Sequence, residues 1–259
     1  MNVAMTIAGS DSSGGAGIQA DLKTFTRLGV FGITAVTAIT AQNTTGVRSA
    51  LELPVDLVRQ QIDFTVEDIR PDACKTGMLA SVAIIECVAE ALRRHRLPNY
   101  VCDPVMVAKS GAPLISDDAI DTLRSKLLPL AALLTPNRFE AARLAGLPTV
   151  EDEPTARDAA HRLLGLGARA VVVKGIRVDQ SVVDLLVTAD GAERLESPRL
   201  PDGRNHGSGC TFSAAVTARL AQRDALSSAV RFAHDFVHRA VAQAPALGRG
   251  VRPVNVLNE

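Results

Sequence analysis

Two glycine-rich segments of the chain are suited to binding a phosphate or another anion. Residues 9–17 read Gly-Ser-Asp-Ser-Ser-Gly-Gly-Ala-Gly and residues 206–210 read His-Gly-Ser-Gly-Cys, and each precedes an amphipathic segment. Glycine lets the backbone approach an anion closely, and a helix N-terminus offers unpaired N–H groups with a partial positive charge. The first segment lacks the Lys-Ser/Thr of a P-loop and the Gly-x-Gly-x-x-Gly spacing of dinucleotide sites, so a turn without a ligand remains an alternative.

The second segment carries the candidate catalytic groups. The amides of Gly207, Ser208 and Gly209 would form a pocket of donors, and Cys210 would stand at the start of the helix. Because a helix N-terminus lowers the pKa of a thiol, Cys210 is a candidate base or polar partner. The alternative is a helix entry in which the cysteine packs as a small apolar side chain.

Polar side chains also follow several short apolar runs. Asp103 could hold a magnesium ion through water, because such ions keep few protein ligands in phosphoryl-transfer sites; the alternative is an aspartate that caps the turn at Pro104. Asn137 and Glu140 share one face of a predicted first helical turn, and their spacing also fits a capping box. Lys174 ends a strongly apolar run, from which it could reach phosphate oxygens or point into solvent.

These residues must be positioned by an alternation of short apolar runs and longer amphipathic segments. The expected strands span residues 3–8, 33–40, 73–76, 100–103, 131–135, 170–174 and 181–187. The expected helices span residues 18–28, 55–69, 81–95, 117–127, 137–145, 156–166, 210–221 and 225–242. This alternation predicts an α/β fold with a mostly parallel, doubly wound sheet, and residues 179–196 predict an inserted β-hairpin that turns at Asp190-Gly191. Ligands of such sheets bind beyond the carboxyl ends of the strands, where the polar residues above stand.

Composition narrows the class of protein. The 28 basic and 28 acidic side chains give a net charge of zero, which argues against broad attraction to nucleic acid or to membrane surfaces. No apolar run approaches the roughly 20 residues of a membrane span, and we expect no secretion signal. Cys74, Cys87, Cys102 and Cys210 lack the spacing of a metal site or a disulfide framework, which suits a reducing compartment. We therefore expect one cytoplasmic domain over residues 1–259.

Taken together, the segments resemble the ribokinase-like superfamily, and within it the hydroxymethylpyrimidine/phosphomethylpyrimidine kinases of thiamine biosynthesis. The matching motifs lie at residues 6–23, 41–44, 75–79, 103–106, 108–111, 135–137, 140 and 206–211. The resemblance implies a three-layer α/β/α fold whose mostly parallel central sheet has about eight strands. It also implies a homodimer that uses ATP and Mg²⁺ to phosphorylate 4-amino-5-hydroxymethyl-2-methylpyrimidine, and then the monophosphate to the pyrophosphate.

The resemblance further implies how the pyrimidine is recognised. In such enzymes the residue matching Gln42 hydrogen-bonds the ring, and an amide can offer both a donor and an acceptor. The positions matching Gly9, Met78 and Val105 line the ring pocket, and Asp21 lies near it.

On the phosphate side, the loop matching residues 207–210 forms the anion hole. Cys210 takes the place of the aspartate base found in sugar-kinase relatives. The residues implied around the metal and the nucleotide are Asp103 and Glu140 for magnesium, and Asn137, Lys174 and Ser208 for ATP.

Two segments depart from the family pattern, and both lie on the nucleotide side. Residues 174–177 read Lys-Gly-Ile-Arg where the family commonly has Lys-Gly-Gly-His. Residues 203–210 read Gly-Arg-Asn-His-Gly-Ser-Gly-Cys where it commonly has Lys-Asn-Thr-His-Gly-Thr-Gly-Cys, and Arg204 could replace the lost positive charge.

Three other functions remain open. A pyridoxal or pyridoxine kinase would act on another aromatic ring that carries a hydroxymethyl group. An oxidoreductase, suggested by the first glycine-rich segment alone, would need an acidic residue about 20 residues past the glycines, where residues 37–42 offer none. A non-catalytic module of the same fold would bind the ring without consuming ATP.

Overall fold

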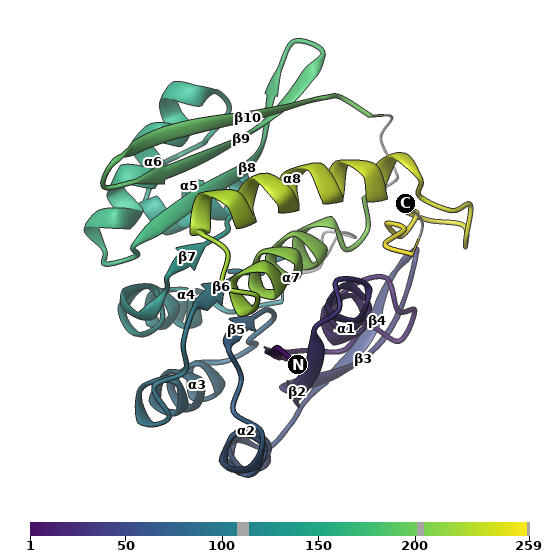
Figure 1. Ribbon diagram of the computed structural model, residues 1–259, viewed down its shortest axis with the longest axis vertical. Coiled ribbons are helices and arrows are strands. Elements are labelled where there is room, and N and C mark those ends of the chain that lie inside the picture. The colour runs from purple at the N-terminus through teal and green to yellow at the C-terminus, as the bar shows by residue number, and fades with distance from the viewer. Residues whose placement is uncertain (108–113, 201–204, 258–259) are drawn as a thin grey trace.

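The computed structural model describes residues 1–107, 114–200 and 205–257, and eight of their strands form one sheet (Figure 1). In chain order these strands are β1 (Val3–Ala8), β2 (Phe31–Val36), β5 (Ala73–Thr76), β6 (Tyr100–Cys102), β7 (Leu133–Leu134), β8 (Ala170–Val178), β9 (Ser181–Thr188) and β10 (Gly191–Pro198). Their spatial order is β10-β9-β8-β7-β6-β5-β1-β2, parallel from β2 to β8 and antiparallel between β8, β9 and β10. The predicted mostly parallel sheet is therefore confirmed.

Helices cover both faces of this sheet and complete a three-layer α/β/α fold (Figure 1). One face carries α1 (Gly17–Arg27), α7 (Ser208–Ala221) and α8 (Leu226–Ala242). The other carries α2 (Val55–Asp68), α3 (Val82–Arg94), α4 (Asp117–Lys126), α5 (Arg138–Ala145) and α6 (Glu153–Gly165). The continuous apolar run of β8 follows from this, because Val171 and Val173 enter one core and Val172 the other.

Helix α7 packs between the sheet and its neighbours α1 and α8. Its sequence is rich in small side chains, such as Ala214 and Ala215, and most of its residues are buried. This close packing places the first turn of α7 directly against the ends of the central strands, where the anion-binding segment was predicted.

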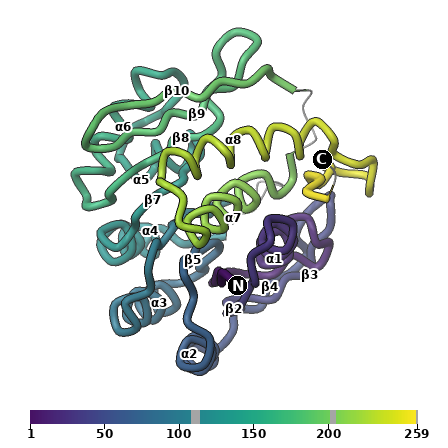
Figure 2. Tube along the Cα trace, in the orientation of Figure 1, coloured from purple at the N-terminus to yellow at the C-terminus, as the bar shows by residue number. Residues whose placement is uncertain are grey.

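The structure corrects the single strand predicted over residues 33–40. The chain leaves the main sheet after β2, and β3 (Ala38–Asn43) pairs with β4 (Gly46–Glu52) in a separate two-stranded sheet. Thr37 marks the break: its amide donates to Ala8 O, and its hydroxyl donates to Met78 O at 2.8 Å. The C-terminal segment lies beside the β3–β4 turn, where Val251 N donates to Thr44 O at 2.9 Å (Figure 2).

Two further predictions concern the second half of the sheet. The strand expected over residues 131–135 shrinks to the two residues of β7, because a 3₁₀ turn (Leu128–Leu130) precedes it. The β-hairpin predicted over residues 179–196 is confirmed as β9 and β10, and it also extends the main sheet through β8. No helix in the described part of the chain is long and apolar enough to cross a membrane.

Candidate active site

The residues predicted at the strand ends meet in one cavity of about 470 Å³. Its walls come from the segments after β1, β5, β6, β7 and β8, from the N-terminus of α7 and from one side of α8. The lining contains every residue for which the sequence suggested a role: Gly9, Asp21, Gln42, Met78, Val105, Asp103, Asn137, Glu140, Lys174, Gly207, Ser208, Gly209 and Cys210. They converge because the carboxyl ends of parallel strands share one edge of the sheet. Of the quoted motifs, residues 108–111 and Arg204 lie outside the described residues.

One end of the cavity has a shape and polarity suited to a flat ring. The hydroxyl of Ser12 holds the backbone of Gln42 by donating to its carbonyl at 2.7 Å and accepting from its amide at 2.8 Å. The β3–β4 register shifts between Ala41 and Gln42, a type of irregularity that re-aims a side chain. A Cβ on Gly9 would lie 3.1 Å from Met78 Sδ, so only glycine leaves the full width between this backbone and the thioether.

A fully buried ion pair forms the floor of the cavity. Lys75 Nζ donates to Asp21 Oδ1 at 2.8 Å, and the hydroxyl of Thr6 donates to Asp21 Oδ2 at 2.6 Å. Burial alone would lower the pKa of Lys75, but the charge of Asp21, together with those of neighbouring groups and the hydrogen bond to Asp21, outweighs burial and raises that pKa. Both oxygens of Asp21 are thus occupied, so Asp21 can influence a ligand mainly through Lys75. We predicted no role for Lys75 from the sequence, although a lysine inside a buried strand indicates a buried acidic partner.

The thiol of Cys210 lies close enough to this ion pair for the charges of Lys75 and Asp21 to act on it. Burial raises the pKa of Cys210 to about 12, and the positive charge of Lys75 only partly opposes this shift. The expectation that the helix N-terminus lowers this pKa is therefore wrong, because the loss of solvent outweighs the helix. At neutral pH the group is a thiol.

The backbone turn at the start of α7 lines the cavity through residues 207–210. Gly207 has a φ of 81°, a left-handed conformation that reverses the chain into the helix. The amide of Ser208 donates to Asn205 O at 3.2 Å. The amides of Gly209 and Cys210 therefore remain as anion donors, because the first turn of a helix leaves its N–H groups without intrahelical partners.

The two glycine-rich segments are joined to each other. His206 Nε2 lies 2.8 Å from Asp11 Oδ2, and the same oxygen accepts the amides of Gly15 and Ala16. A Cβ on Gly207 would lie 1.7 Å from Gly15 O, so the segments pack backbone against backbone. The sequence reasoning had quoted Asp11 and His206 only as parts of motifs, and no local signal links residues this far apart.

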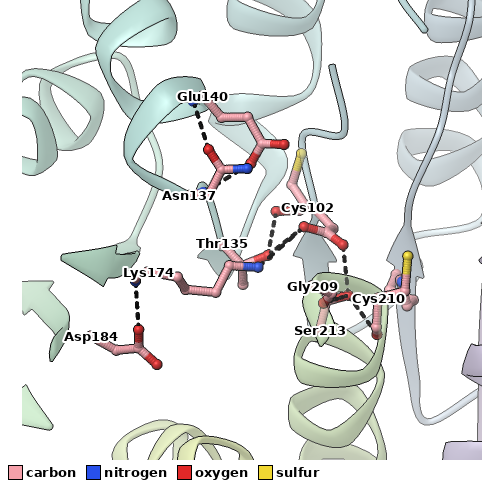
Figure 3. Close-up of polar contacts among 12 residues, drawn as sticks. Cys102, Thr135, Asn137, Glu140, Lys174, Asp184, Gly209, Cys210 and Ser213 are labelled. Carbon is pink, nitrogen blue, oxygen red and sulfur yellow. Dashed lines mark hydrogen bonds and ion pairs between the residues drawn. The ribbon is translucent and has the colours of Figure 1, made fainter. Parts of the chain in front are cut away.

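The acidic side of the cavity centres on Asp103. The carboxylate accepts from Thr135 Oγ1 at 3.1 Å and from Ser213 Oγ at 3.0 Å, and Lys174 Nζ lies 3.5 Å from Oδ1. Burial would raise the pKa of Asp103, but Lys174 and then Lys75 outweigh it and lower that pKa. Figure 3 shows the side chains of Thr135, Lys174 and Ser213, which come from different elements, directed toward the same region.

Glu140 completes the acidic side and also caps α5. Its carboxylate accepts from Asn137 N at 2.8 Å, and the Asn137 side chain accepts from Glu140 N, so the capping-box interpretation is confirmed (Figure 3). Burial first, and the charge of Asp103 second, raise the pKa of Glu140 to about 8. In the described residues no cluster of three or more metal-ligating side chains occurs. The oxygens of Asp103 and Glu140 nevertheless fit Mg²⁺, which usually keeps several waters and the substrate's phosphates as ligands, and a cation there would favour the ionised form of Glu140.

The fold and the site together define a ribokinase-like kinase. The features that do so are a parallel sheet with helices on both faces, amides at the start of α7, a lysine and two carboxylates.

The phosphomethylpyrimidine kinase family matches residues 11–255. The hydroxymethylpyrimidine/phosphomethylpyrimidine kinase of Escherichia coli (strain K12) is 45% identical over 97% of this chain and 96% of its own length. The thiamine biosynthesis bifunctional protein of Geobacter sulfurreducens is 47% identical over 97% of this chain and 51% of its own length. The Bacillus subtilis pyridoxal kinase in its ADP complex has a TM-score of 0.93 and 40% identity, with both chains fully covered. The chain belongs to the phosphomethylpyrimidine kinase family.

Proposed function

We propose that the protein transfers a phosphoryl group from ATP to 4-amino-5-hydroxymethyl-2-methylpyrimidine, and then to its monophosphate, in thiamine biosynthesis. The observation that carries this proposal is the shared cavity, whose lining includes Gln42, the first residues of α7 and Lys174. Family membership over nearly the whole chain supports it. A coupled ADP-release assay with the pyrimidine and with its monophosphate tests it: turnover of both is expected, and turnover of neither refutes it.

In this mechanism the chain mainly positions the reactants and stabilises charge, because the transition state of phosphoryl transfer is loose. Gln42 orients the ring so that its hydroxymethyl arm meets the amides of Gly209 and Cys210. These amides and Lys174 stabilise negative charge on the transferring group. Asp103 and Glu140 would hold a magnesium ion, which neutralises phosphate charge when it is bound.

Cys210 stands where the hydroxyl proton must leave. With a pKa of about 12 the group is a thiol, so it is a poor base in the resting enzyme. A loose transition state needs little removal of the proton before the phosphoryl group has moved, so a thiol that relays the proton late suffices.

A pyridoxal kinase activity is the second candidate, favoured by the likeness to the Bacillus subtilis pyridoxal kinase. Comparing kcat/KM on pyridoxal and on the hydroxymethylpyrimidine separates the two. A preference for pyridoxal would overturn the first assignment.

The proposal includes a homodimer built from one polypeptide domain. Strand β2, the β3–β4 sheet and α2 expose large apolar side chains, namely Phe31, Ile39, Leu51, Leu57 and Phe64. Such a patch favours contact with a second copy. Light scattering tests it, and a monomer at micromolar concentration would refute the dimer. The four unpaired thiols fit a cytoplasmic location.

A further inference from the structure

Lys174 lies on an irregularity of β8 that brings the lysine to the phosphate side of the cavity. Val173 pairs with Leu185 and Ile176 with Val183, so Lys174 and Gly175 together stand opposite the single residue between them on β9, Asp184. This is the geometry of a β-bulge, which bends a strand and re-aims its side chains. Gly175 has a φ of 78°, which glycine adopts without strain.

The bulge points the ammonium of Lys174 at the other phosphate-side groups. Its Nζ lies 3.5 Å from Asp103 Oδ1, 5.1 Å from the ring centroid of Phe212, and 3.7 Å from where a Cβ on Gly209 would be. On the edge of β8 that faces away from β9, Lys174 N donates to Pro136 O at 2.9 Å. The position of the ammonium therefore depends on how the bulge is held.

Asp184 holds the bulge from the facing strand. Its Oδ1 accepts the amide of Gly175 at 2.9 Å, the N–H that the bulge takes out of the regular strand pairing. Figure 3 shows Asp184 beside the Lys174 segment, with a dashed line that joins its carboxylate to that segment. A carboxylate is a stronger acceptor for such an amide than a backbone carbonyl.

The second oxygen of Asp184 is held in turn by α8. His234 Nδ1 lies 2.8 Å from Asp184 Oδ2, and His234 Nε2 lies 2.7 Å from Ser197 Oγ on β10. All three side chains are buried, and all three line the wall of the cavity. Burial lowers the pKa of His234, but the hydrogen bond and charge of Asp184 outweigh it and raise that pKa. A buried imidazole that pairs at both nitrogens leaves its carboxylate partner a single orientation.

We infer that Asp184 and His234 are positioning residues for the phosphate donor: His234 orients Asp184, Asp184 fixes Gly175 N, and the fixed bulge holds Lys174 against the nucleotide phosphates. The inference rests on the proposed function in that Lys174 contacts phosphate. It predicts that variants at these positions lose affinity for the nucleotide and keep their affinity for the pyrimidine. The reason is that the ring end of the cavity is built from β1, β3 and β5.

The test is calorimetric titration of ADP without metal, combined with KM values for ATP and for the pyrimidine. We expect Asp184→Ala to weaken ADP binding and to raise the KM for ATP about tenfold, the size of one lost charge-assisted contact. The KM for the pyrimidine should stay within about twofold. Asp190→Ala, on the exposed turn of the same hairpin, is the matched control and should change none of these values.

A second pair of variants separates positioning from general packing. The side-chain amide of His234→Asn can reach Asp184 as Nδ1 does, so this variant should keep ADP affinity within about threefold. His234→Leu fills the site without a donor and should lose about tenfold. If Asp184→Ala does not fold, Asp184→Asn, which keeps an acceptor for Gly175 N, and the His234 pair decide the question.

Three outcomes overturn the inference: unchanged ADP affinity in folded Asp184→Ala, an equal loss in His234→Asn and His234→Leu, or parallel increases in both KM values. Failure of the proposed function is distinguishable from these. It would appear as wild-type protein that binds ADP yet releases none from ATP with either pyrimidine, and the ADP affinities of the variants would still decide the inference.

Discussion

His206 and Asp11 lie 195 positions apart in the chain, and their side chains meet at 2.8 Å inside the protein. Asp11 also accepts the amides of Gly15 and Ala16, just before α1, and His206 immediately precedes the turn into α7. One carboxylate therefore fixes the segment beside the ring and the segment beside the phosphates, so the spacing between the two halves of the site depends on this contact.

Replacing Asp11 with Asn should lower the stability of the fold at neutral pH and make that stability less dependent on acid. Hydrogen bonds, first from His206 and then from Ser13, outweigh burial and lower the pKa of Asp11 to about 2. An acid with a depressed folded-state pKa stabilises the fold at pH values above its unfolded pKa, and this contribution is lost as the pH falls from 4 towards 2. The shift corresponds to roughly 2 kcal/mol. Urea titrations at pH 6 and pH 3 should show a smaller acid-dependent loss in Asp11→Asn than in the wild type, and equal losses would contradict this.

Replacing Cys210 with Ala should lower kcat on the order of 100-fold, in line with the loss of one proton-transfer group. Because the pKa of Cys210 is raised to about 12, alkylation by iodoacetamide should be slow at pH 7 and accelerate up to strongly alkaline pH. Mass spectrometry of the modified peptide measures this directly. Rapid labelling at pH 7, or full turnover by the alanine variant, would rule out this account of the thiol.

Replacing Lys75 with Met should destabilise the fold by about 3–5 kcal/mol, because it leaves the buried carboxyl group of Asp21 without its partner. The double replacement Lys75→Met with Asp21→Leu should recover much of this loss, since apolar pairs often replace buried ion pairs at little cost. Denaturant titration of the four proteins closes the double-mutant cycle. A single-variant loss below about 1 kcal/mol would mean that Asp21 has other compensation.

Replacing Gly175 with Ala should cost about 1–2 kcal/mol through backbone strain alone. A Cβ there would meet nothing within 4 Å, so the positive φ is the whole obstacle. Gly165, at the end of α6, provides the control because its Cβ would also meet nothing and its φ is not positive. Gly165→Ala should leave stability unchanged or raise it slightly. Equal effects of the two replacements would show that the conformation at Gly175 is not restrictive.

The sequence was sufficient to predict the location of those site residues whose positions follow from local pattern and sheet geometry. Asp103, Asn137 and Lys174 follow apolar runs, and parallel strands bring such positions together whatever the details of packing. The break at Thr37 was missed because residues 33–40 read as one apolar run, and the hydrogen bonds that divide it come from Ala8 and Met78.

The chemistry of buried groups was harder to predict. The pKa of Cys210 depends on how much solvent α7 excludes, and a helix N-terminus in the sequence gives no measure of that. The linkage from Gly175 through Asp184 to His234 and Ser197 joins one strand edge, a hairpin and a helix, so no spacing in the sequence could have indicated it.

The segment near the C-terminus binds both halves of the cavity. Val251 N donates to Thr44 O beside the strand of Gln42, while Arg252 O and Val254 N bond the backbone of His206. A chain cut before residue 251 would keep the strands of the main sheet but lose these backbone contacts, so we expect it to lack a stable ligand site.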